Sequence, residues 1–286
     1  MVVRCYYAGM QAWMRTALLV FALGFAATIG SIAALGLTSQ RGSLGPTILQ
    51  ANTPVLAASL TVLVLIVTTV LGIVTAKATT AASGMFVVGF GLFTMAMRTD
   101  GVTEFVFSDS SSTLLVFEAV FMSLCLLISS LAMFRFGGLL QDVPQNEKGA
   151  YAYPFALKNI LSVVLLSLAM LPVVWVVAVT PTKGQAIGSA FVGGVIVAVL
   201  ARKYTPHLQP ILYYAIPTAV AAIGYAVAAT MGITDIGFTQ NTISTLIFPM
   251  PIDYAAGSIM GVSVGLSWGA SLAQKVTDRN PKQKSV

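Results

Sequence analysis

The sequence has few charged residues. Asp, Glu, Lys and Arg together make up 8% of its 286 residues, whereas they make up about 25% of an ordinary soluble domain. Apolar residues account for 57%, and the mean hydropathy is +0.89. Because water could not solvate a surface this poor in charge, the composition excludes an ordinary soluble protein. It predicts a membrane protein whose helices are surrounded by the lipid bilayer.

Residues suited to catalysis or metal binding are also scarce. The chain has one histidine, His207, in a loop between two prolines, so bis-histidine haem ligation is excluded. Its two cysteines, Cys5 and Cys125, are too far apart in sequence to indicate a disulfide framework or a metal site. The sequence contains no P-loop, G-x-G-x-x-G or C-x-x-C motif. We therefore expect no catalytic residue, no metal and no cofactor, and the sequence does not predict an enzyme.

Basic residues outnumber acidic ones, which gives a net charge of +6 and a pI of about 9.4. A nucleic-acid-binding protein would gather its basic residues into a patch or a stripe. In this chain they are scattered singly between apolar runs. We therefore expect no nucleic-acid partner, and we interpret the basic residues as signals of membrane topology.

Eight apolar runs are close to the length of about 20 residues that crosses a bilayer as a helix. We expect an all-α, polytopic transmembrane bundle in which residues 1–286 form a single membrane domain that ends in a basic tail at 274–286. The main alternative has seven spans, with the first run removed or the second and third divided wrongly. The predicted spans are residues 15–37, 54–76, 82–97, 114–134, 157–180, 185–201, 211–231 and 254–273.

The first three runs need a closer argument. Residues 15–37 follow a basic start, as a secretory signal does, but a signal core has only about 7–15 apolar residues. The break at residues 77–80 is weak. Without it, one helix of more than about 40 residues would have to fit a hydrocarbon core about 30 Å thick, which it cannot. We therefore expect the first run to be a span, and the second and third to form a tight hairpin.

The distribution of Lys and Arg predicts the orientation. In the eight-span arrangement, 12 of the 15 basic residues fall on the side of both termini, and only Arg41, Arg98 and Lys183 fall on the other side. Cytoplasmic segments of membrane proteins carry an excess of basic residues. The count therefore predicts cytoplasmic N- and C-termini in an inner or plasma membrane.

Glu118 is the most informative ionisable residue, because it lies inside a predicted span, near the outer end of that span. A charge inside a membrane is costly and often has a function, so Glu118 is a candidate site for binding a proton or a cation. In the alternative interpretation, the carboxyl group reaches the membrane interface or forms a hydrogen bond with a neighbouring helix. The sequence does not decide between the two.

Two prolines fall within predicted spans, Pro172 in the fifth and Pro217 in the seventh. Each frees a carbonyl group from helical hydrogen bonding and is a candidate helix kink. Membrane helices tolerate proline in general, however, so these kinks do not by themselves predict a transport path.

Small residues recur in the last predicted span. The glycines fall at every fourth position, as Gly257, Gly261, Gly265 and Gly269. On a helix, this spacing creates one smooth face that a second helix can approach closely. We expect a helix-packing seam inside the bundle. The alternative is a seam with a second copy of the chain or with another membrane subunit.

Residues 232–253 form an unusual connection because they contain no basic residue and mix Thr, Asn and Gln with large apolar side chains. Such a segment is poorly suited to extend into water. We expect it to cover the bundle or to dock against another subunit, with a partly re-entrant segment as the alternative.

Two classes of function fit this sequence. The first is a non-catalytic subunit or scaffold of a membrane assembly, because catalytic groups are missing and small-residue faces are suited to helix packing. The second is a transporter or channel for a small neutral or weakly charged solute, which the two prolines, the hydroxyl groups and Glu118 favour. An enzyme acting on lipids ranks third, because the acidic residues form no catalytic pattern.

Overall fold

The computed structural model describes residues 11–279 except 40, 109–110, 146–150 and 241, and it describes side chains as far as residue 269. Over this part of the chain the secondary structure is helical. It contains no β-strand, only the isolated bridges Thr38–Leu44 and Ser39–Ala51. The all-α class predicted from the sequence is confirmed.

The helices follow the apolar runs of the sequence, with short turns of helix in the connections. In chain order they are α2 (Ala12–Ala33) with the 3-10 turn η1 (Ala34–Leu37), α3 (Pro54–Ala78), α4 (Ala81–Ala96), α5 (Val102–Val106), α6 (Ser112–Ala132) with the π-helix η2 (Met133–Gly137), α7 (Leu157–Ser167), α8 (Met170–Val177), α9 (Lys183–Tyr204), η3 (Leu212–Tyr214), α10 (Ile216–Thr230), α11 (Asp235–Thr239), η4 (Thr245–Ile247) and α12 (Pro251–Arg279).

Five helical segments are long and apolar enough to cross a membrane, whereas α4 and α10 are apolar but shorter. Large apolar side chains on these helices point outward; Val55 of α3 is 80% exposed and Phe21 of α2 is 67% exposed. Such faces are suited to contact with lipid rather than water. The five segments are Ala12–Leu37, Pro54–Ala78, Ser112–Gly137, Leu157–Val177 and Lys183–Tyr204.

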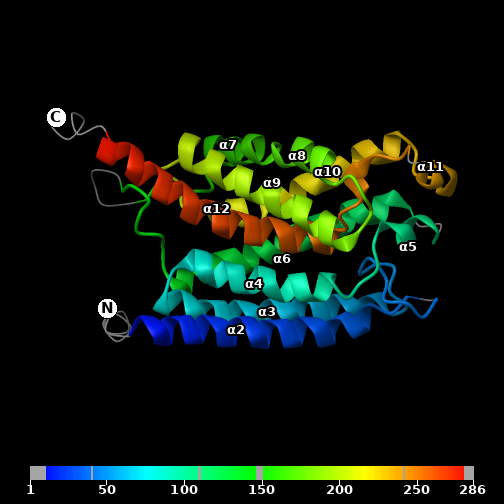
Figure 1. Cartoon of the computed structure of the whole chain (residues 1–286), viewed down its shortest axis with the longest axis horizontal. Helices are drawn as coiled ribbons and strands as arrows, with labels where there is room; N and C mark the ends of the chain where they lie inside the picture. Colours follow the sequence, from blue (N-terminus) through cyan, green and yellow to red (C-terminus); the bar gives the residue numbers. More distant parts are fainter. Residues whose placement is uncertain (1–10, 40, 109–110, 146–150, 241, 280–286) are drawn as a thin grey trace.

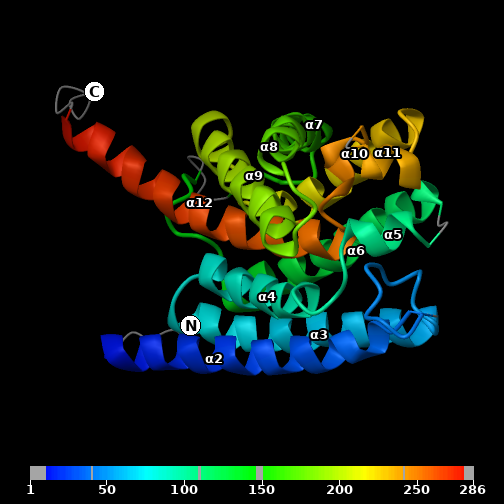
Figure 2. The ribbon, with the colours of Figure 1, turned by 45° about the vertical axis from the view of Figure 1, so that its right-hand side comes forward.

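The long helices form two groups that cross at an angle: α2 and α3 lie across the view of Figure 2, whereas α7 and α8 are seen nearly end-on (Figures 1 and 2). The first group is α2, α3 and α4, in which α4 packs against both of its neighbours. The second group contains α7 to α10 and α12, with α12 packed along α9. Helix α6 lies between the groups and packs against α10, α12 and α3. The start of α2 and the finish of α12 lie at the same end of the bundle; we call it the terminal end and the opposite end the loop end.

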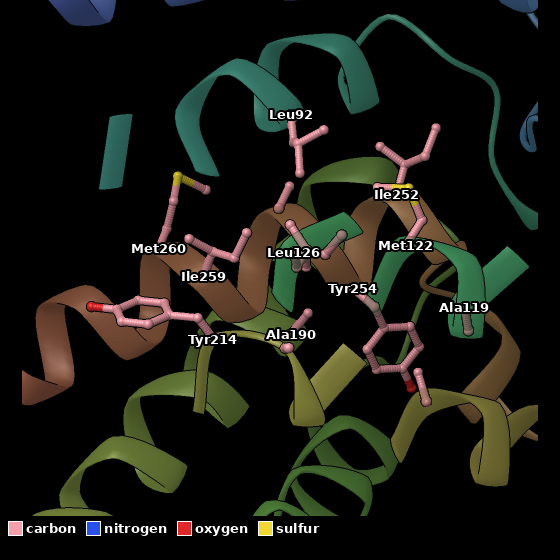
Figure 3. Close-up of a cluster of buried hydrophobic side chains, with 14 of the residues drawn as sticks. Leu92, Ala119, Met122, Leu126, Ala190, Tyr214, Ile252, Tyr254, Ile259 and Met260 are labelled. Carbon is pink, nitrogen blue, oxygen red and sulfur yellow. The ribbon is translucent and has the colours of Figure 1, made fainter. Parts of the chain in front are cut away.

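The two groups meet where α4 packs against α12. Figure 3 shows the apolar side chains at this junction, with Leu92 from α4, Met122 and Leu126 from α6, and Ile252 and Ile259 from α12. All five are fully buried. Between helices surrounded by lipid, such side chains stabilise the fold through close van der Waals packing rather than through removal from water. Toward the terminal end, α12 diverges from α4 (Figure 2).

The turn between α3 and α4 is as tight as the sequence predicts. Helix α3 ends at Ala78, and α4 begins at Ala81 after Thr80, whose hydroxyl group accepts the N–H of Ser83 at 3.2 Å. The two helices approach closely: a Cβ added to Gly72 would lie 2.5 Å from the carbonyl oxygen of Gly84.

The two prolines have different roles. The helical path is interrupted between Ser167 at the end of α7 and Met170 at the start of α8, just before Pro172. This position agrees with the missing N–H of Pro172, which cannot bond to the carbonyl of Leu168 one turn earlier. Pro217, by contrast, is the second residue of α10. Since an N–H there would have no intrahelical partner, Pro217 begins a helix rather than bending one.

The glycines spaced by four on α12 face α9. A Cβ added at Gly257 would lie 2.6 Å from the carbonyl oxygen of Ile187, and one at Gly265 would lie 2.7 Å from that of Val195. Both distances are shorter than any real contact of a Cβ atom, so only glycine allows this approach. The close contact lies within the chain itself. The glycines concerned are Gly257, Gly261, Gly265 and Gly269.

Candidate functional site

A cleft of about 870 Å³ opens at the terminal end of the bundle. Both groups of helices contribute to it: α2 and the α3–α4 turn form one side, and α9 and α12 form the other. The π-helix η2 and the segment that follows it line the remainder. The lining residues are Arg15, residues 76–82, residues 135–142, Arg202, Leu266 and Ser267.

The cleft is rich in positive charge. Among the described residues, it is lined by four basic side chains, Arg15, Lys77, Arg135 and Arg202, and by one acidic side chain, Asp142. Nη2 of Arg202 lies 2.6 Å from Oδ2 of Asp142, so these two form an ion pair. The side chains of Lys77 and Arg135 are exposed, and basic side chains placed in this way are suited to binding an anion.

Arg202 is the best held of these basic residues. Its side chain is only 14% exposed, because α12 packs over it at Gly269. Within the described residues, its Nε has no hydrogen-bond partner. A guanidinium group presents several donors in one plane, which matches the oxygens of a phosphate or a carboxylate. Arg202 therefore places a guanidinium group in the wall of the cleft, held by its ion pair with Asp142.

Two local features position the wall that carries Asp142. The side-chain amide of Gln209 donates to the carbonyl of Leu140 at 3.0 Å and accepts the N–H of Leu140 at 3.1 Å. Before this, the chain leaves α6 through the π-helix η2 and turns at Gly138, whose φ is 109°. Helical turns of the π type are frequent at functional sites.

A smaller apolar groove of about 270 Å³ adjoins the cleft and shares Ala82 and Ser267 with it. It lies between α2, α4 and α12, and Trp268 at its edge is 58% exposed. The groove is lined by Leu19, Ala82, Ser83, Phe86, Ser263, Val264, Ser267 and Trp268.

The loop end contains a buried ion pair. Nζ of Lys183, at the start of α9, lies 2.8 Å from Oδ1 and 3.0 Å from Oδ2 of Asp253. Asp253 is fully buried and also accepts the N–H of Met250 at 2.9 Å, so it caps the start of α12. The pair therefore ties the beginning of α9 to the beginning of α12.

Glu118 lies near the loop end in the interior of the protein. It is 1% exposed, and its Oε2 accepts the N–H of Leu49 at 3.2 Å. Among the described residues, its Oε1 has no hydrogen-bond partner. The partner is thus the folded-in loop between α2 and α3, not the membrane interface and not a neighbouring helix.

The second half of the connection at residues 232–253 covers the loop end. The hydroxyl group of Tyr225 donates to the carbonyl of Pro249 at 2.7 Å, and that of Tyr254 donates to the carbonyl of Leu246 at 3.2 Å. Helix α11, in the first half, has no buried residue and projects from the bundle (Figure 1). The buried apolar side chains of the second half are Ile243, Leu246, Ile247, Phe248, Met250 and Ile252.

The structure does not bring the sequence-predicted site residues together. Glu118 lies at the loop end, and the glycines of α12 lie against α9. Pro172 and Pro217 lie in the first turns of α8 and α10, in the second group. The basic cleft was not predicted. In the sequence, its four basic residues were interpreted only as topology signals. The topology placed all four on the same side of the membrane, and this was the one indication that they could line a common cleft.

The described residues contain no group of three or more His, Cys, Asp or Glu side chains that could hold a metal ion. Neither a protein-family model, nor a curated protein, nor a solved structure matches this chain. The geometry of the cleft and of the covered loop end is therefore the basis for proposing a function.

Proposed function

We propose that the protein is a membrane transporter with eight spans that takes up an anionic solute in the cleft at its terminal end. The observation that carries this proposal is the one-sided opening of the bundle. The two groups of helices diverge around a basic cleft at the terminal end, while buried chain covers the loop end.

The membrane topology is the first part of the proposal. Three further helices, α4, α10 and α12, accompany the five long apolar segments. They pack against those segments within the bundle, which supports eight crossings. The terminal end carries most of the basic residues, so the positive-inside rule favours a cytoplasmic position for it and for both termini. In this topology the protein lies in the inner or plasma membrane, and its cleft opens to the cytoplasm.

The two groups of helices supply the moving parts. Many transporters work by the rocking of one bundle against another around a fixed site. Here the junction of α4 with α12 is apolar and lies between the covered end and the open end. A rotation about this junction would close the cleft and open the loop end. It would have to separate Glu118 of α6 from the loop between α2 and α3, whereas the Lys183–Asp253 pair joins two helices of the second group and would stay intact.

Binding of an anionic probe to the cleft tests the proposal. We expect inorganic pyrophosphate to raise the thermal unfolding temperature of the detergent-purified protein, because a ligand that binds only the folded state stabilises it. The Lys77→Gln/Arg135→Gln variant removes two exposed basic side chains of the cleft and should lose this effect. Lys203→Gln is the matched control, because Lys203 lies beside Arg202 but does not line the cleft. Equal stabilisation of all three proteins, or of none, would contradict the proposal.

A non-catalytic subunit of a membrane assembly is the second candidate function, and helix α11 favours it. This helix projects from the bundle with Ile236 63% exposed and has no buried residue, as a docking segment would. Purification in mild detergent followed by mass determination separates the two candidates. A stoichiometric partner that is lost on Ile236→Asp substitution would support the subunit role.

A further inference from the structure

The basic cleft and the apolar groove are adjacent, and we call the two together the recess. They share two small residues, Ala82 on α4 and Ser267 on α12, over which one ligand could extend from the cleft into the groove. The basic side chains line the part at the terminal end, and apolar side chains line the part that runs between α2, α4 and α12. A ligand that fills both parts needs an anionic head and an apolar tail.

The groove opens toward the side of the bundle rather than into its centre. Trp268 at its edge is 58% exposed, and the neighbouring surface of α2 carries the exposed Val20 and Phe21. Such apolar faces are suited to lipid, and Trp is enriched where the hydrocarbon core meets the headgroups. The basic part of the recess then lies at the level of the headgroups, and the groove extends from there toward the hydrocarbon core.

We infer that this recess binds an anionic phospholipid, with its phosphate at Arg202, Arg135 and Lys77 and one acyl chain along Leu19, Phe86 and Val264. The inference rests on the proposed function, since it names the class of anion that the cleft takes up. A small soluble anion would use the basic cleft alone and would leave the apolar groove without a role.

Size and charge both fit this ligand. The cleft of about 870 Å³ lies within the range of roughly 300–1,000 Å³ that is common for small-molecule sites. Basic pockets between membrane helices on the cytoplasmic side bind the headgroups of anionic lipids. The zwitterionic headgroup of phosphatidylcholine adds a positive charge, which the basic residues repel, so the recess selects lipids with a net negative charge.

Quenching of Trp268 by brominated lipids tests the inference. The chain has three tryptophans, so Trp13→Phe and Trp175→Phe leave Trp268 as the single reporter. This protein is placed in phosphatidylcholine bilayers that contain a minor fraction of lipid with brominated acyl chains, either phosphatidylglycerol or phosphatidylcholine. We expect stronger quenching by brominated phosphatidylglycerol. Adding Lys77→Gln/Arg135→Gln should lower this selectivity roughly 30-fold, because each of the two basic residues near the membrane surface adds about 1 kcal/mol of attraction and about 1.4 kcal/mol is a factor of ten. Lys203→Gln should leave the selectivity unchanged.

Two outcomes overturn the inference. Equal quenching by the two brominated lipids means that Trp268 only touches bulk lipid. If the quenching is equal but pyrophosphate still stabilises the protein through Lys77 and Arg135, the cleft binds a soluble anion. The proposed function then survives without the lipid. If neither probe depends on the basic residues, both proposals fail. Because Lys77 and Arg135 are exposed, their replacement tests binding without removing a buried group.

Discussion

Lys183 and Asp253 form an ion pair, 2.8 Å long, between the first residue of α9 and the third residue of α12. The Asp253 side chain is fully buried, and that of Lys183 is 15% exposed. These two helices also share the close contact along the glycines of α12. The pair therefore sets the relative position of α9 and α12 at the loop end, while the terminal end is left open at the cleft.

Removing the lysine should destabilise the protein strongly. Lys183→Met leaves the Asp253 carboxylate buried without its counter-ion, which costs about 3–5 kcal/mol when a buried pair is broken. Lys183→Met/Asp253→Asn should recover part of the loss, because no charge then remains buried. Thermal unfolding of the purified variants in detergent measures both effects. If the double variant is less stable than Lys183→Met, the pair does not have this role.

The close contact between α12 and α9 predicts that replacing a glycine by alanine lowers stability inside the contact but not outside it. In Gly261→Ala, the new Cβ would overlap the backbone of α9 at Phe191, so the unfolding temperature should fall by several degrees. Gly188→Ala on α9 is the control, because its Cβ meets nothing within 4 Å. It should be neutral or stabilise by up to about 1 kcal/mol, since Ala favours helix over Gly. A stable Gly261→Ala protein that loses an oligomer would instead place the seam on the outside of the bundle.

Glu118 should hold the loop between α2 and α3 in place. Glu118→Leu removes the acceptor for the N–H of Leu49, and an unpaired buried donor costs about 1–3 kcal/mol. The loosened loop should expose Arg41, which is already 54% exposed, to trypsin. Cleavage after Arg41 should therefore be faster than in the unchanged protein. Glu118→Gln keeps an acceptor oxygen and should resist cleavage, and identical rates for all three proteins would exclude this role.

Membrane orientation can be tested with single cysteines. In a background with Cys5→Ser and Cys125→Ser, we expect Ile236→Cys on α11 to react from outside intact cells with a membrane-impermeant maleimide. His207→Cys, at the exposed turn between α9 and η3, should react only after the membrane is opened. Helix α11 and the end of α9 lie at opposite ends of the bundle (Figure 1). Labelling of both from the same side would contradict the proposed topology.

Much of the fold could be predicted because local signals mark the ends of the helices. Pro54 begins α3, and Thr80 caps α4 in the turn that the length argument requires. Pro217 was harder, since its effect depends on where the helix starts: the irregular turn at η3 makes it the second residue of α10. A proline in an apolar run does not reveal whether it lies in the first turn of a helix or in the interior of one.

The candidate site could not be predicted because it depends on long-range contacts. The partners Lys183 and Asp253 are 70 residues apart in the chain, and Lys183 was interpreted only as a topology signal. Arg15 and Arg202 line the same cleft because α12 diverges from α4, and no local pattern in the sequence encodes this divergence. The glycine spacing predicted close packing, but the choice of α9 as the partner came from the tertiary structure.

Transport by the protein reconstituted in liposomes tests the central claim most directly. The vesicles contain phosphatidylcholine and a minor fraction of fluorescent phosphatidylglycerol, and a membrane-impermeant reductant added outside reports movement between the leaflets. Pyrophosphate trapped inside parallel vesicles reports movement of a soluble anion. We predict that the unchanged protein and Lys203→Gln move one of these anions faster than protein-free vesicles, whereas Lys77→Gln/Arg135→Gln does not. If neither anion moves faster than in protein-free vesicles, or if the double variant is as active as the unchanged protein, the transport function proposed for the cleft is wrong.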